Sequence, residues 1–229
     1  MQDITGEEGT GIWSNSEAVS EHIPAPTLTT AHYLRIASAD RAQRDRARQT
    51  MGADYPPQKI EVKNRDAFLE DLRLAVYASC LAAYVQGINI IDKVNRERHW
   101  NINFDQVLQI WRAGCIIQAD YISELLEPIF DDFKSKDTMN LLFQPATAKD
   151  LKKGKPSLQR IVADAVKADH VVPAMSATLE YIKYQTGHGE HATADGRKET
   201  LLTLLIRSSH IILRGGARLL RSSHVRQER

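Results

Sequence analysis

One segment, running from Arg65 to about Arg98, carries the strongest helical pattern in the chain and constrains the fold most. Asn64 precedes it, and asparagine is a favoured N-cap because its side chain accepts a hydrogen bond from a free amide of the first turn. Apolar residues recur along it at helical spacing: Phe68, Leu69, Leu72, Val76, Leu81, Val85, Ile88 and Ile91. Small residues fill other sides of the same helix: Ala75, Ala78, Ala82, Ala83 and Gly87. A helix that is small and apolar on several sides is typical of the centre of a bundle.

The remaining segments also favour helices, and none shows the alternation of a β-strand. The expected helices run from Ser14 or Ser16 to His22, from Thr27 to Thr50, from Phe104 to Arg112, and from Gly114 to about Phe133 with an interruption near Pro128. A short helix is expected to end at Gln144-Pro145, and two more run from Ser157 to Ala168 and from Ala174 to Gln185. The sequence therefore predicts an all-α fold, a helical bundle.

Composition and charge narrow the function classes. The 229 residues have a formal charge of +1, which gives no case for binding nucleic acid or an acidic membrane. The N-terminus resembles neither a signal nor a transit peptide, and no apolar run reaches the roughly 18 residues of a membrane span, so we expect a cytoplasmic protein. Cys80 and Cys115 lie in apolar helical patterns, which predicts two reduced core thiols rather than a disulfide.

Two short motifs have ordinary explanations. The glycine-rich stretch 6–11 lacks the preceding strand and the G-x-G-x-x-G spacing of a phosphate-binding loop, so a flexible connection is favoured. His188 and His191 could form a metal pair, but no third ligand stands nearby, and we predict no metal site.

A set of separated motifs points to one family. The chain contains Gly9-Thr10-Gly11-Ile12-Trp13, Tyr77-Ala78-Ser79 leading to Tyr84-Val85-Gln86-Gly87, and Trp111-Arg112-Ala113-Gly114-Cys115-Ile116-Ile117. In order and spacing they resemble the stretches G-T-G-K-W, Y-A-S…Y-A-Q-G and W-R-G-G-C-I-I of the helical C-terminal half of 6-phosphogluconate dehydrogenase, in a fungal-like form. The resemblance covers about residues 3–186.

The resemblance implies oxidative decarboxylation of 6-phosphogluconate to ribulose 5-phosphate, a step of the pentose phosphate pathway, with NADP accepting the hydride. In that family an N-terminal Rossmann domain binds NADP, and a K-x-x-H-N-x-x-E stretch upstream of the helical half supplies a general base and a general acid. The present sequence contains no K-x-x-H-N-x-x-E. We therefore expect no catalytic residue and no cofactor-binding residue in this chain, and no NADP binding by the chain alone.

Two substrate-contacting positions of the family are matched here, Thr10 and Arg35. By resemblance both bind the sugar phosphate, and a guanidinium suits this role because it offers paired donors to phosphate oxygens. One position departs from the family: its loop lysine is replaced by Glu8, whose carboxylate would repel a phosphate.

The C-terminal stretch differs in composition from the rest of the chain. Residues 197–229 hold eight Lys or Arg against Glu199 and Glu228. The family ends in a tail containing D-Y-F-G-A-H, which is missing here. Arg214 to Glu228, back-translated with permitted codons and read one nucleotide later, can spell E-A-E-L-D-Y-F-G-A-H-M-F-D-K. We therefore expect a helical domain at residues 1–186 and a basic tail at 187–229 that is either disordered or translated in a shifted frame.

These features predict the C-terminal part of a 6-phosphogluconate dehydrogenase-like enzyme, inactive as an isolated fragment and lacking the Rossmann domain. The resemblance also implies a homodimer, and a 6-phosphogluconate-like substrate in the full-length form. Two alternatives remain open: a non-catalytic helical dimerisation module, and a paralogue acting on another phosphorylated sugar acid. The W-R-x-G-C-I-I pattern disfavours other β-hydroxyacid dehydrogenases.

Overall fold

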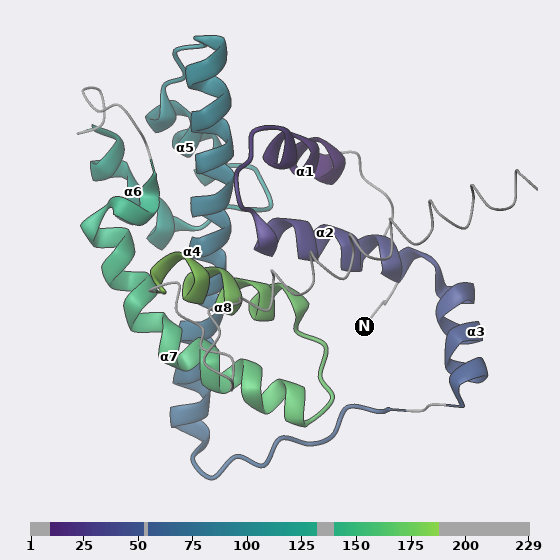
Figure 1. The fold of residues 1–229 in the computed structure, drawn as a ribbon. Coiled ribbons are helices and arrows are strands. Elements are labelled where there is room, and N and C mark those ends of the chain that lie inside the picture. The colour runs from purple at the N-terminus through teal and green to yellow at the C-terminus, as the bar shows by residue number, and fades with distance from the viewer. Residues whose placement is uncertain (1–9, 53–54, 132–139, 188–229) are drawn as a thin grey trace, which may run out of the picture. The chain divides into compact units, whose positions relative to one another are not determined.

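The computed structural model describes residues 10–52, 55–131 and 140–187, which form helices and loops with no β-strand among them (Figure 1). These helices belong to one compact unit, residues 1–182, except for the end of α8, which lies beyond Ile182. In chain order they are α1 (Thr10–Ser20), α2 (Pro26–Ala39), α3 (Arg41–Met51), α4 (Arg65–Arg98), α5 (Phe104–Arg112), α6 (Asp120–Asp131), the short 3₁₀ helix η2 (Leu141–Phe143), α7 (Pro145–Lys167) and α8 (Pro173–Thr186). The predicted all-α class is confirmed.

Helix α4 has the bounds that the sequence predicts. The side chain of Asn64 accepts a hydrogen bond from the amide of Ala67 at 3.1 Å, as an N-cap should. At the other end His99 adopts the left-handed conformation, with φ of 54°, and its amide donates to the carbonyl of Asn95. Both ends of this helix are therefore set by local hydrogen bonds.

Helix α7 lies along α4, and the two make the most extensive contact between any pair of described elements (Figure 1). The two helices approach closely at Gly154 of α7. A Cβ atom built on Gly154 would lie 2.6 Å from the Cβ of Ala78 and 3.1 Å from the carbonyl oxygen of Leu74. The two backbones can come this close only because one residue has no side chain and the other has a methyl group.

A polar cluster also joins α4 and α7. The carboxylate of Asp71 accepts hydrogen bonds from Arg160 Nε at 2.7 Å, from Arg160 Nη2 at 2.5 Å and from Ser157 Oγ at 2.8 Å. The bonds from Arg160, and then that from Ser157, lower the pKa of Asp71 to about 2. This paired contact joins the start of α4 to the second half of α7.

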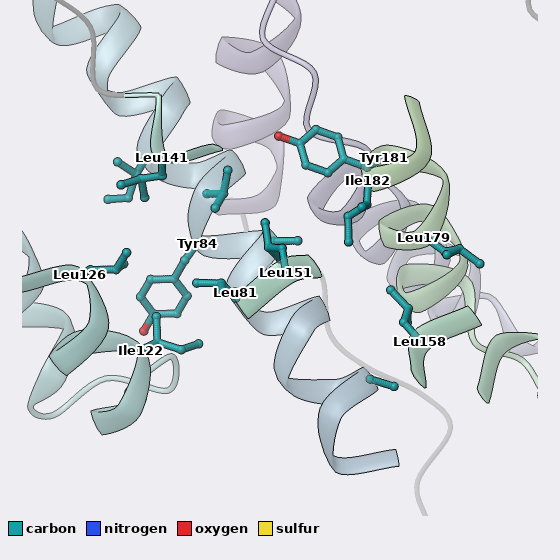
Figure 2. Packing of buried hydrophobic residues seen from close by; sticks show 14 of the residues in the cluster. Leu81, Tyr84, Ile122, Leu126, Leu141, Leu151, Leu158, Leu179, Tyr181 and Ile182 are labelled. Carbon is teal, nitrogen blue, oxygen red and sulfur yellow. The ribbon is translucent and has the colours of Figure 1, made fainter. Parts of the chain in front are cut away.

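The main hydrophobic core collects around α4. Figure 2 shows Leu81 and Tyr84 of α4 between side chains from α6 and side chains from α7 and α8. Its fully buried large members are Leu81, Val85, Ile88, Leu126, Leu141 and Leu158. A second, smaller cluster consists of Ala18, Ala25 and Ile90, and it attaches α1 and the start of α2 to α4.

The two N-terminal helices differ from the prediction. Helix α1 begins at Thr10 rather than at Ser14 or Ser16, because Ser14 lies inside the helix and its hydroxyl donates to the carbonyl of Gly11. The predicted single helix from Thr27 to Thr50 is wrong, because the chain bends at Asp40, which has φ of −90° and ψ of 79°. The Asp40 carboxylate accepts from the amide of Gln43 at 2.9 Å and so caps a new helix, α3.

Two later helices also have different bounds. Residues 114–119 are not helical, and α6 begins only at Asp120, after which Pro128 lies inside it without ending it. Helix α7 begins at Pro145 rather than at Ser157. Proline is well suited to the first turn of a helix, where no amide donor is needed, and Pro156 is accommodated because the carbonyl it leaves unpaired belongs to the exposed Lys152.

The cysteine prediction is only half right. Both thiols are free, as expected, but neither belongs to the core: Cys80 is exposed and Cys115 is half-buried. The reason is that α4 presents one stripe of its surface away from α7, and Cys80 lies on that stripe.

By length and composition alone, α4 is apolar enough to cross a membrane, which differs from the expectation that no apolar run reaches the length of a membrane span. Half of its most apolar window is buried inside the protein. This is weak evidence for a membrane, since the central helix of a globular bundle has the same composition.

We predict that Gly154→Val lowers the stability of the domain by about 1–3 kcal/mol, because the added side chain overpacks the contact with α4. The matched control is Gly87→Ala on α4, where an added Cβ meets no atom within 4 Å. That change should raise stability by roughly 0.5–1 kcal/mol, as alanine favours a helix over glycine. Urea unfolding followed by circular dichroism measures both, and equal effects of the two variants would contradict the close contact.

Candidate functional site

The candidate site lies on α1 and α2, which run antiparallel. Residues with increasing numbers on α1 contact residues with decreasing numbers on α2. The contacts that show this are Gly11 with His32, Asn15 with Thr29, and Ala18 with Ala25, which immediately precedes α2. The start of α1 therefore lies beside the second half of α2.

The contact at Gly11 is very close. A Cβ atom built on Gly11 would lie 2.1 Å from Nδ1 of His32 and 2.6 Å from Cε1 of the same ring. Any side chain at this position would displace the imidazole. Glycine thus lets the first turn of α1 pack against α2, and a hydrogen bond from Thr29 Oγ1 to Asn15 Oδ1, 2.9 Å long, holds the next turn.

Thr10 is the first residue of α1, although its side chain lies outside the described residues. The amides at the start of an α-helix have no partner within the helix, and the helix dipole places partial positive charge there. No acidic residue lies in the first turn of α1. The start of this helix is therefore suited to an anion.

Arg35 lies one turn beyond His32 on α2 and is half-buried. Its carbonyl accepts a hydrogen bond from Ser38 Oγ at 2.7 Å. Because the antiparallel register places His32 against Gly11, the turn that carries Arg35 lies about one turn past this contact, at the end of the helix pair where α1 begins. The structure thus brings the two predicted positions, Thr10 and Arg35, to the same end of the helix pair.

The bend at Asp40, which differs from the predicted single helix, ends α2 soon after Arg35. Arg44 of α3 donates to the carbonyl of Ser38 at 3.1 Å and so satisfies an end of α2. A hollow of about 540 Å³ opens at this bend, lined by Ile36, Ala37, Ala39, Asp40, Gln43 and Arg44. The signal was present in the sequence, since Asp followed three residues later by Gln is a capping pattern.

A second cavity, of about 390 Å³, is apolar and is lined in part by residues of α4. It is lined by Leu28, Cys80, Ala83, Tyr84, Gly87, Trp111, Ile116, Ile117, Gln118 and Ala119. The Tyr84 hydroxyl donates to the carbonyl of Ile117, and burial raises the pKa of Tyr84. Such a lining offers few polar partners to a sugar phosphate.

The described helices contain neither a dinucleotide-binding motif nor a cluster of metal ligands. A Rossmann-type dinucleotide site needs a strand leading into a glycine-rich turn, and residues 10–52, 55–131 and 140–187 contain no strand. Within the same ranges no three His, Cys, Asp or Glu side chains come together as metal ligands would. Glu8, His188, His191 and the basic tail lie outside the described residues.

The structure defines the class of protein as an all-α domain built on one long central helix. Residues 1–193 match the family described as "6-phosphogluconate dehydrogenase, C-terminal domain". The chain therefore belongs to the 6-phosphogluconate dehydrogenase family, as the motifs predict.

Individual relatives agree. The chain is 41% identical over 187 residues to a decarboxylating 6-phosphogluconate dehydrogenase of Emericella nidulans, covering 82% of this chain and 37% of that protein. It is 31% identical over 183 residues to a decarboxylating enzyme of Oryza sativa, covering 78% and 36%. A solved 6-phosphogluconate dehydrogenase of Plasmodium falciparum superposes with a TM-score of 0.72 at 28% identity, covering 90% of this chain and 41% of that one. The chain thus spans less than two fifths of the length of these curated relatives.

We predict that Gly11→Ala moves the His32 ring, since the added methyl carbon would lie 2.1 Å from its Nδ1. The ring cross-peaks of His32 in a carbon–proton NMR spectrum should shift, whereas Gly87→Ala should leave them in place. Unchanged His32 signals in Gly11→Ala would show that the start of α1 does not pack against α2 in solution.

Proposed function

We propose that this chain is the part of a decarboxylating 6-phosphogluconate dehydrogenase that holds the phosphate of the substrate. The reaction is oxidative decarboxylation of 6-phosphogluconate to ribulose 5-phosphate, with NADP as hydride acceptor. The single observation that carries the proposal is the antiparallel register of α1 and α2, in which Gly11 meets His32, so that Arg35 lies at the end of the helix pair where α1 begins.

In this proposal the chain contributes binding rather than proton transfer. The guanidinium of Arg35 offers paired donors to phosphate oxygens, and the backbone amides of the α1 turn that begins at Thr10 would add neutral donors. NADP, when bound to another part of such an enzyme, supplies the oxidation. The solved Plasmodium falciparum relative is described with NADP+ as its cofactor and 6-phosphogluconate as its substrate, which supports both ligands.

We expect Arg35→Ala to weaken binding of 6-phosphogluconate at least tenfold, because a charge-assisted hydrogen bond contributes about 1.5–3 kcal/mol. Arg35→Lys should recover only part of the affinity, since an ammonium lacks the paired donor geometry. Isothermal titration calorimetry measures the dissociation constants, and Arg46→Ala on the exposed helix α3 is the matched control for loss of a positive charge. If Arg35→Ala binds as tightly as the unaltered chain, Arg35 is not a phosphate ligand.

A paralogue acting on another phosphorylated sugar acid is a second candidate, and Glu8 favours it. The family has a lysine at this position, and a carboxylate there disfavours the family's substrate. The same titration, repeated with phosphorylated sugar acids of other chain lengths, distinguishes the two candidates. Tighter binding of one of these acids than of 6-phosphogluconate would favour the paralogue.

We also predict that the chain alone neither binds NADP at micromolar concentration nor oxidises 6-phosphogluconate. The reason is that the described residues contain no strand for a dinucleotide fold and the sequence contains no K-x-x-H-N-x-x-E. Calorimetry with NADP and absorbance at the NADPH band test the two statements separately. Turnover above the buffer rate would contradict the proposal that this chain contributes binding rather than catalysis.

The alternative of a dimerisation module shares one feature with the proposed enzyme, self-association. Large apolar side chains are exposed on α1, α2 and the loop before α6: Ile12, Trp13, Tyr33, Leu34 and Ile116. We predict a dimer in analytical ultracentrifugation at micromolar concentration, since several large exposed apolar side chains on one domain are typical of an interface. Trp13→Glu should shift the equilibrium toward monomer, and a monodisperse monomer of the unaltered chain would contradict the prediction.

A further inference from the structure

A fully buried amide on α4 holds the first turn of α2. Gln86 has no exposed surface, and both ends of its side chain reach a single residue. Gln86 Oε1 accepts from the amide of Thr27 at 3.0 Å, and Gln86 Nε2 donates to Thr27 Oγ1 at 2.9 Å. The side-chain amide of Gln86 thus forms hydrogen bonds with both the backbone and the side chain of Thr27.

The hydrogen bond from the Thr27 amide to Gln86 replaces a missing N-cap of α2. Ala25, at the N-cap position of α2, has no side chain that could bond a free amide, and Pro26 has no amide proton. The Thr27 amide is one of the donors that a helix leaves without an internal partner. Gln86 supplies the acceptor from a residue 59 positions away, so the position of the α2 start depends on α4.

A further hydrogen bond links Thr27 to Thr178 of α8, and its donor can be assigned. The Thr27 and Thr178 hydroxyl oxygens lie 2.9 Å apart, and Thr178 Oγ1 donates to the carbonyl of Ala174 at 2.8 Å. Thr178 uses its only proton on Ala174, so the Thr27 hydroxyl must donate to Thr178 while it accepts from Gln86. Each of the two hydroxyls donates one hydrogen bond and accepts one, so the direction of every bond is fixed. The three side chains that form this hydrogen-bonded series, Gln86, Thr27 and Thr178, are all buried.

We infer that Gln86 is a positioning residue for Arg35, acting through Thr27 and the axis of α2; this rests on the function proposed above. Arg35 lies eight residues beyond Thr27, about 12 Å along the helix at 1.5 Å per residue. A tilt of α2 by roughly 5° about its start would displace the turn of Arg35 by about 1 Å, a helix-geometry estimate. A paired guanidinium–phosphate contact is weakened by a displacement of that size.

The decisive comparison is between Gln86→Met and Thr178→Val. Gln86→Met keeps the length of the side chain but removes both bonds to Thr27. Thr178→Val removes the link to α8 and leaves the Gln86–Thr27 bonds in place. Both variants should lose stability, but only Gln86→Met should raise the dissociation constant for 6-phosphogluconate, by about tenfold, with Thr178→Val within twofold of the unaltered chain. Equal losses of affinity in the two variants would overturn the inference, because they would reflect stability alone.

A double-mutant cycle tests whether Gln86 acts through Arg35. In the Arg35→Ala background, Gln86→Met should change the dissociation constant less than twofold, since the group it positions is already absent. A further tenfold loss there would overturn the inference. Thr27→Val, which keeps the amide bond to Gln86 Oε1 and removes the hydroxyl, should give an intermediate affinity and serves in place of Gln86→Met if that variant does not fold.

A readout without substrate separates this inference from the proposed function. Nitroxide labels at Leu34→Cys on α2 and Val76→Cys on α4, both exposed positions, report the distance between the two helices when the native cysteines are changed to serine. Gln86→Met should widen or shift this distance distribution, and Thr178→Val should not. If Arg35→Ala leaves affinity unchanged, the proposed function fails while this distance still decides the role of Gln86; an unchanged distribution in Gln86→Met overturns that role.

Discussion

The contact of Gly154 with Ala78 is the constraint on which the rest of the fold depends. It allows α7 to lie against α4 with only a methyl group between their backbones. The flanking apolar side chains then interdigitate, and Leu81, Val85 and Leu158 become fully buried. The ion pair of Asp71 with Arg160 joins the same two helices. Apolar burial supplies most of the stability here, because an ion pair with an exposed guanidinium contributes little.

Much of this architecture follows from sequence pattern. The bounds of α4 were predictable because Asn64 is a strong cap and because the apolar spacing continues without a break as far as Arg98. The bounds of α7 were not, because Pro145 and Pro156 read as interruptions. In the structure one proline begins the helix and the other lies inside it, beside an exposed carbonyl. Proline is a helix breaker only where its missing donor or its ring matters, and single-sequence patterns do not show that.

The candidate site shows a similar division. Family motifs identify Thr10 and Arg35 as positions, but their proximity depends on how α1 and α2 pair, and that register is set by the contact of Gly11 with His32. Gln86 belongs to a motif that the sequence displays plainly, yet its role could not be predicted. Its partners Thr27 and Thr178 are distant in sequence and become neighbours only when three helices pack. Short-range signals such as caps are readable from sequence, whereas buried long-range hydrogen bonds are not.

The antiparallel pairing of α1 with α2 has a consequence for how such a domain can evolve. At the end where a short loop joins the two helices, Ala18 and Ala25 are buried in one cluster with Ile90, so substitutions there disturb packing. At the open end, where the two helices carry Thr10 and Arg35, neighbouring side chains such as Ile12 and Tyr33 are exposed. Substitutions at exposed positions usually change stability by less than about 0.5 kcal/mol. Under the proposed function, exposed positions near Thr10 and Arg35 can change ligand preference or the pairing of two copies with little loss of stability, whereas Gly11 and the buried alanines cannot change freely.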